Sequence, residues 1–186
     1  MANRSYDLGL VLGLDAESLG VPGQRTFRIH AHSRNGAARL WLEKEQLRAL
    51  ATAIEQLLVE IGPPRRRAPG SSPFVPFPGS PTIEFHVGRI TLGYEQDSEL
   101  VMMTLYELVA TEDEEEEDPP SPLTPPPSGD EVQLQATREQ MRAFSERAQD
   151  VVAAGRPRCP LCGTPLDGPT HFCPRTNGHA TLPHDE

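Results

Sequence analysis

The fold of this chain is indicated most clearly by the stretch Glu43-Lys-Glu-Gln-Leu-Arg-Ala-Leu-Ala-Thr-Ala-Ile-Glu-Gln-Leu-Leu-Val-Glu-Ile61. Its apolar residues recur at intervals of three and four, which places them on one side of an α-helix. They are Leu47, Leu50, Ala51, Ile54, Leu57, Leu58 and Ile61. Gly62-Pro63 then ends the helical pattern. The stretch is therefore predicted to form an amphipathic helix that packs on a sheet.

The residues before this helix alternate between apolar and polar side chains, which is the pattern of half-buried strands. Strands are predicted over residues 6–14 and 26–32. Asn35-Gly36 is a strong hairpin signal, so residues 38–42 are expected to return beside residues 26–32. In that arrangement Trp41 points away from the core.

The residues after the helix continue the strand pattern over 83–87, 90–94 and 100–109. They pair most simply as an antiparallel meander. The predicted fold class is α+β, with an antiparallel sheet of about five to seven strands and two amphipathic helices on one face.

A second amphipathic helix is predicted after a short strand at residues 132–135. Thr137 and Gln140 match the capping-box pattern at its start. Its opening, Glu139-Gln-Met-Arg-Ala-Phe144, echoes Glu45-Gln-Leu-Arg-Ala-Leu50 at an offset of 94. One interpretation is a duplicated strand-strand-helix unit, and the other is convergence on a composition that suits helix starts.

Two proline-rich segments, residues 63–81 and 111–130, are predicted to be disordered because they cannot form regular backbone hydrogen bonds. The second is also strongly acidic. The expected organisation is an α+β body over residues 1–155, followed by a zinc-knuckle module with a flexible tail over residues 156–186.

The zinc prediction depends on Cys159-Pro-Leu-Cys162-Gly163 and on Cys173, the three cysteines of the chain. A two-residue spacer brings both sulfur atoms to one tetrahedral ion. The fourth ligand is His171 or, as the alternative, His179, because Thr176 occupies the place of a second Cys-x-x-Cys. Such a closed, zinc-ribbon-like site has a structural role. The competing interpretations are a redox dithiol, which the neighbouring prolines disfavour, and free thiols.

The charge of the chain bears on its partners. Its formal net charge is −10, and seven of the negative charges lie in residues 112–118, which leaves −3 for the remainder. A nucleic-acid partner is not expected, because binding phosphates normally requires a basic face. The sequence has no signal peptide and no apolar run long enough to span a membrane, so we expect a cytoplasmic protein without a membrane partner.

A second candidate site consists of His30 and His32 on one strand, with His86 nearby. Paired imidazoles are typical of metal or acid-base sites, although the simpler interpretation is the polar outer face of a sheet. The chain contains no phosphate loop, nucleophile elbow or dinucleotide fingerprint. We therefore expect a non-enzymatic adaptor or regulatory protein. The alternative is an enzyme of phosphate or thiol-cofactor metabolism.

Four stretches resemble one family across nearly the whole chain. They are Gly20-Val-Pro-Gly-Gln-Arg-Thr-Phe27, Leu42-Glu-Lys-Glu-Gln46, Gly155-Arg-Pro-Arg-Cys-Pro-Leu-Cys-Gly163 and His171-Phe-Cys-Pro-Arg-Thr-Asn-Gly178. The family is an uncharacterised actinobacterial one, domain of unknown function 3090. The resemblance implies a cytoplasmic protein encoded beside a phosphatidylinositol-kinase-like and a phosphoglycerate-mutase-like protein, and hence a protein partner in a phosphate-related pathway. It also favours His171 over His179 as a zinc ligand.

Overall fold

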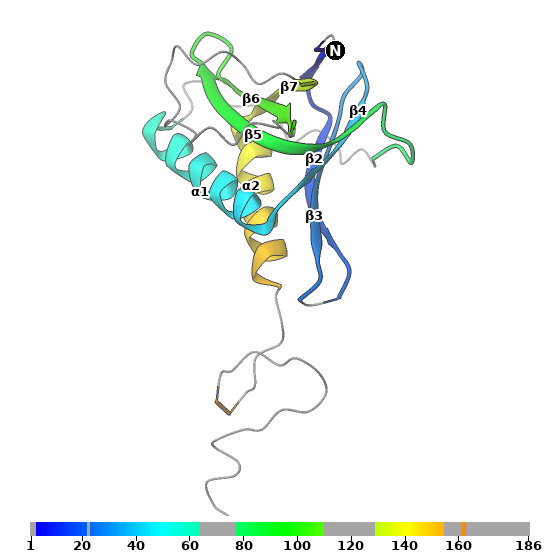
Figure 1. Cartoon of the computed structure of the whole chain (residues 1–186). Coiled ribbons are helices and arrows are strands. Elements are labelled where there is room, and N and C mark those ends of the chain that lie inside the picture. Colours follow the sequence, from blue (N-terminus) through cyan, green and yellow to red (C-terminus); the bar gives the residue numbers. More distant parts are fainter. Residues whose placement is uncertain (1–2, 22, 64–76, 110–128, 155–160, 163–186) are drawn as a thin grey trace, which may run out of the picture.

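The computed structural model describes residues 3–21, 23–63, 77–109, 129–154 and 161–162. Figure 1 shows a curved sheet with both helices in its concave side. In these residues the elements are β1 (Ser5–Leu10), β2 (Gly13–Leu19), β3 (Thr26–His32), β4 (Ala37–Leu42), α1 (Lys44–Glu60), β5 (Ile83–Glu95), β6 (Leu100–Glu107), β7 (Glu131–Thr137) and α2 (Arg138–Ala153). No helix of the described part is long and apolar enough to cross a membrane.

The seven strands form one mixed sheet in the order β1-β7-β6-β5-β4-β3-β2. The α+β class is confirmed, but the prediction of a purely antiparallel sheet is wrong. Two pairs, β4 with β5 and β1 with β7, are parallel. The first arises because α1 carries the chain back to the end of the sheet where β4 began, so that β5 runs in the same direction as β4.

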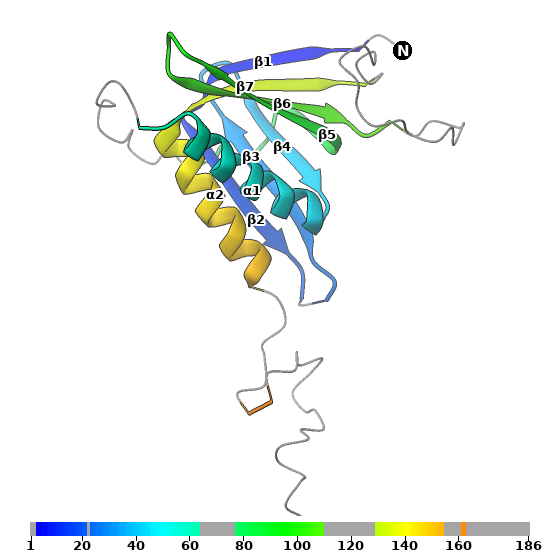
Figure 2. The same cartoon turned by 90° about the vertical axis from the view of Figure 1, so that its left-hand side faces the viewer.

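The sheet closes on itself through the residues that join β1 to β2. These strands stand at opposite ends of the sheet order, yet only Val11 and Leu12 separate them. The Val11 amide donates to the Gln135 carbonyl on β7, and the Leu12 amide donates to the His32 carbonyl on β3. Because so few residues span only about 10 Å, both edges of the sheet must meet there. The sheet therefore bends around α1 and α2 (Figure 2).

The strand predictions differ from the structure where a strand changes partner. The strand at residues 26–32 is confirmed, whereas the single strand predicted over residues 6–14 is divided between β1 and β2. Conversely, the two strands predicted over residues 83–94 are one continuous strand, β5. Its first residues pair with β4 and its later residues pair with β6, with a register shift between Val87 and Arg89.

The structure repeats one arrangement twice, because β2-β3-β4-α1 and β5-β6-β7-α2 are each a three-stranded antiparallel meander followed by a helix. Both helices begin with the same glutamine clamp. Gln46 accepts from the backbone amide at its own N-cap and donates to the Val87 carbonyl at 3.1 Å. Gln140 likewise accepts from the backbone amide of its N-cap residue, Thr137, and donates to the Val11 carbonyl at 2.8 Å. Each glutamine thus connects the start of a helix to a backbone carbonyl near the place where the chain changes its strand partner.

The helices also contact one another through equivalent positions. The buried Ser145 hydroxyl donates to the Ala51 carbonyl, and Gln149 contacts Glu55; both pairs are 94 residues apart. Contacts between equivalent residues are what a local two-fold relation between the helices produces. Beneath them lies the core, whose largest fully buried side chains include Ile29, Leu40, Leu47, Ile54, Met103, Leu134, Met141 and Phe144.

Most of residues 63–81 and 111–130, and nearly all of the predicted zinc module, lie outside the described residues. The domain boundary at residue 155 therefore stays a prediction. The described α+β body ends with α2.

The clamps predict a specific loss of stability. Gln140→Ala leaves the N-cap amide and the Val11 carbonyl without partners, so we expect the free energy of unfolding to fall by about 1–3 kcal/mol. Gln46→Ala should have a similar effect. Gln56→Ala, at an exposed position of α1, is the matched control and should cost less than about 0.5 kcal/mol. Urea unfolding measures all three, and equal losses in Gln56→Ala and Gln140→Ala would contradict the clamp.

Candidate functional site

The outer face of β2, β3, β4 and β5 carries two rows of polar and aromatic side chains that follow the strand register. One row is Asp15, His30, Arg39 and Glu84, and the other is Glu17, Arg28, Trp41 and His86. We call these eight residues the Trp41 face. The sequence places them there because they alternate along the strands with apolar residues that are buried on the opposite side. The buried residues are Phe27, Ile29, Leu40 and Phe85.

Trp41 is the centre of the second row. The Arg28 guanidinium lies 5.3 Å from the centre of the indole, and the His86 ring is stacked at 6.3 Å with an interplanar angle of 25°. The indole Nε1 donates to Glu84 Oε1 at 2.8 Å. These contacts hold a half-exposed tryptophan in one orientation on the surface of the sheet.

Each carboxylate of the Trp41 face is paired with its own guanidinium. Arg28 contacts Glu17 at 2.7 Å, Arg39 contacts Glu84 at 3.3 Å, and Arg147 of α2 reaches Asp15 at 3.5 Å. The three negative charges and the three positive charges cancel. Among the described residues of this face, the histidines therefore decide the net charge.

His30 and His32 lie beneath the aromatic ring of Phe77. The ring centre of Phe77 is 4.3 Å from that of His30 and 6.0 Å from that of His32. His32 is only 6% exposed. Its imidazole occupies the space above Gly13, where an added Cβ would lie 2.3 Å from the ring. A glycine at this position is thus required for His32 to lie flat against β2.

Burial lowers the pKa of both histidines. For His32 the cause is the loss of hydration. For His30 the pKa is lowered first by the loss of hydration and then by the positive charge of Arg28, while Glu17 acts in the opposite direction. Both imidazoles are therefore held in the neutral form at neutral pH.

The repeated half of the protein provides an internal reference for this face. The strands equivalent to β2, β3, β4 and β5 are β5, β6, β7 and β1, and their registers align the same rows. The row that contains His30 corresponds to Thr91, Thr104, Gln133 and Asp7. The row that contains Trp41 corresponds to Gly93, Met102, Gln135 and Leu10. The same backbone therefore folds with a mostly neutral outer face, and the fold does not require the charges and the tryptophan.

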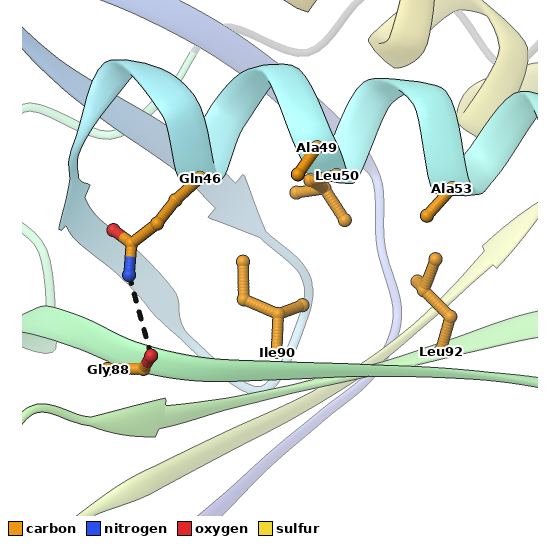
Figure 3. A pocket seen from close by; sticks show the side chains of 7 residues that line it. All are labelled: Gln46, Ala49, Leu50, Ala53, Gly88, Ile90 and Leu92. Atoms are coloured by element: carbon orange, nitrogen blue, oxygen red, sulfur yellow. Dashed lines mark hydrogen bonds between the residues drawn. The ribbon is translucent and has the colours of Figure 1, made fainter. Parts of the chain in front are cut away.

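The described residues also form an apolar cavity of about 330 Å³ between α1 and β5. In Figure 3, Ile90 and Leu92 point from β5 toward Ala49 and Ala53 of α1, and Gln46 closes one end by its bond to the Gly88 carbonyl. The lining of the cavity is apolar apart from the Gln46 side chain and the Gly88 backbone. This cavity offers no acid, base or nucleophile for catalysis.

The structure brings together only part of the residues singled out from the sequence. His30 and His32 are neighbours, whereas His86 lies in the other row beside Trp41. Of the predicted zinc ligands, Cys159, Cys173, His171 and the alternative His179 lie outside the described residues, and Cys162 lies within them. No group of three metal-ligating side chains occurs in the described part of the chain.

Sequence reasoning missed Phe77 and the contacts of Trp41. The alternation of residues 26–32 and 38–42 correctly predicted that Trp41 faces outward, but two of its partners, Glu84 and His86, come from β5, which is distant in sequence. Phe77 belongs to a segment that was read only as proline-rich. The presence of an aromatic residue in a proline-rich segment is the signal that could have identified Phe77 as a contact residue.

These features define an α+β protein with a mixed sheet and with a charged and aromatic outer face on one half of a repeated arrangement. The chain belongs to a family of proteins of unknown function, described as Protein of unknown function (DUF3090), which matches residues 6–173. The family expected from the sequence is thereby confirmed. Comparison with curated proteins and with solved structures found no match.

The buried histidines predict how stability depends on pH. Because the pKa of each is lower in the folded state, the unfolded chain binds more protons once the pH falls below about 6.5. The stabilisation is complete above that pH and is lost as the pH falls through the folded-state pKa. We expect His32→Gln to reduce this acid destabilisation, as measured by urea unfolding between about pH 8 and 5. Gln135→Ala, which removes no titratable group, should retain the wild-type slope; an unchanged slope in His32→Gln would contradict the assignment.

Proposed function

We propose that the protein is non-enzymatic and acts by binding a protein partner through the Trp41 face. The observation that carries this proposal is the difference between the two halves of the sheet. Trp and Arg are the side chains most enriched among residues that dominate binding energy, and here they are held in fixed orientations on an open face. The equivalent positions on the other half are occupied by Met102 and Gln135.

The alternative is an enzyme of phosphate or thiol-cofactor metabolism that uses His30, His32 and His86. Two observations disfavour it. His86 is separated from the other two histidines by its place beside Trp41, and the cavity between α1 and β5 is lined by apolar residues. A catalytic site normally combines a concave pocket with convergent polar groups.

Zinc binding is the second part of the proposal. Three thiolates, from Cys159, Cys162 and Cys173, and one imidazole, from His171 or alternatively His179, are a complete tetrahedral donor set. A closed set leaves no position for substrate, so the ion would stabilise the C-terminal module. The support for this site is the spacing of the donors.

The zinc proposal is tested by metal content. Protein purified without chelator should contain one zinc ion per chain by elemental analysis, and Cys159→Ser should lose most of it. Ser145→Ala, in the helix interface, is the control and should retain the metal. Because the described core is formed by residues before Gly155, Cys159→Ser should keep the wild-type far-UV circular dichroism of the body. Wild-type protein free of zinc would overturn the proposal.

The partner proposal is tested by capture from a lysate of the native host. Wild-type protein and Gln135→Ala should retain the same protein, whereas Trp41→Ala and Arg28→Ala should lose it. Gln135→Ala is the matched control, because it alters the equivalent position on the other half. Removal of a dominant binding residue costs at least about 2 kcal/mol, so Trp41→Ala should weaken affinity for the isolated partner roughly 30-fold. Retention by Trp41→Ala, or no capture by the wild type, would contradict the proposal.

A further inference from the structure

Three side chains that each carry a buried nitrogen atom without a hydrogen-bond partner contact a single aromatic ring. Within the described residues, four buried side-chain atoms have no partner, and three of them are His30 Nε2, His32 Nε2 and Arg39 Nε. All three side chains contact Phe77: the two imidazoles at the distances given above, and the Arg39 guanidinium at 5.9 Å from the ring centre. The unsatisfied groups are therefore clustered.

Such a cluster is costly. A buried polar group without a partner costs about 1–3 kcal/mol, and native proteins contain few of them. Glu17 Oε2 lies 3.2 Å from His30 Nε2 but is poorly aligned for a hydrogen bond, and it already accepts from Arg28 at 2.9 Å. Phe77 cannot satisfy any of the three nitrogen atoms through a conventional hydrogen bond. The ring covers donors that a polar ligand would use.

We infer that His30, His32 and Arg39 form a binding site for a doubly charged oxyanion of the phosphate or sulfate class, and that Phe77 covers this site when it is empty. The Nε–H of Arg39 is a fixed donor, and each imidazole becomes a donor at both nitrogen atoms once it is protonated. Phosphate-class anions recruit such charge-assisted donors. This inference stands independently of the proposed partner.

The charges around the site agree with an anion rather than a cation. Among the described residues, the charged groups that face it are Asp15 and Glu17 on β2, Arg28 on β3, Arg39 on β4, Glu84 on β5 and Arg147 on α2, and they cancel in pairs. Two protonated histidines would therefore make the site positive. A metal ion is disfavoured, because the described residues do not place a third metal-ligating side chain with the two imidazoles.

Binding should consequently be coupled to proton uptake. The histidines are neutral in the empty site because they are desolvated beneath Phe77. An anion that displaces the ring favours the imidazolium form, so its affinity must rise as the pH falls. Removal of Phe77 should also favour binding, because the cover no longer has to be displaced.

Sulfate is the appropriate probe, because its own charge does not change between about pH 6 and pH 8. Its affinity for the full-length protein is measured by calorimetry at constant ionic strength, with chloride as the competing anion. We expect at least about tenfold tighter binding at about pH 6 than at about pH 8. Arg39→Gln should weaken sulfate binding at least about tenfold, since it removes a charge-assisted donor. Gln135→Ala, at the position equivalent to Trp41 on the other half of the sheet, should leave it unchanged.

Phe77→Ala separates this inference from a purely structural role of the ring. If Phe77 covers the site, its removal should strengthen sulfate binding. If Phe77 only supports the core, its removal should weaken sulfate binding. Either of two binding results would overturn the inference: a wild-type affinity that is independent of pH, or equal binding by wild type and Arg39→Gln when both are folded by circular dichroism. Imidazole NMR signals of His30 and His32 that do not shift on addition of sulfate would also overturn it.

Discussion

The closure of the sheet at Val11 and Leu12 is the constraint on which the rest of this structure depends. Two backbone amides, one donating to β7 and the other to β3, join the two edges of the sheet. Because β1 and β2 are parts of one short run, the sheet has to bend, and its concave side is filled by two helices whose contact is made between equivalent residues. The convex side of β2 to β5 is then presented to the outside as one continuous surface. Gln140 supports the bend by donating a hydrogen bond to the Val11 carbonyl.

The repeated halves separate what the fold requires from what a binding role requires. Buried positions are apolar in both halves: Phe27 and Ile29 on β3 correspond to Val101 and Met103 on β6. The outer positions differ in chemistry, although their backbones share the same register. Holding Arg28 and His30 at 16% and 12% side-chain exposure costs hydration free energy, which neutral residues at equivalent positions do not incur. The ion pairs of Arg28 offset part of this cost, and the remainder is the observation that supports the proposed binding role of the face.

The sequence was sufficient to predict those helices and strands that are determined by patterns within a short stretch of residues. The helical spacing of residues 43–61 and the alternation of residues 26–32 predicted α1 and β3, and the capping pattern at Thr137 located the start of α2. Strand direction could not be obtained in this way, because alternation reports which side chains are buried and not whether a neighbour is parallel. The Trp41 face was only half predicted for a related reason. Its outward residues follow from alternation, but the ring of Phe77 reaches His30 across more than forty residues of sequence, and no local pattern encodes that contact.

The two rows of the Trp41 face share their carboxylates, and this sharing connects the proposed anion site to the proposed partner surface. One oxygen of Glu17, Oε2, contacts both His30 and Arg28, and Glu84 contacts both Arg39 and Trp41. A proton on His30 draws Glu17 toward the imidazolium and weakens its hold on Arg28, whose guanidinium lies over Trp41. Thermodynamic linkage is reciprocal, so a partner that binds Arg28 and releases Glu17 would in turn favour protonation of His30.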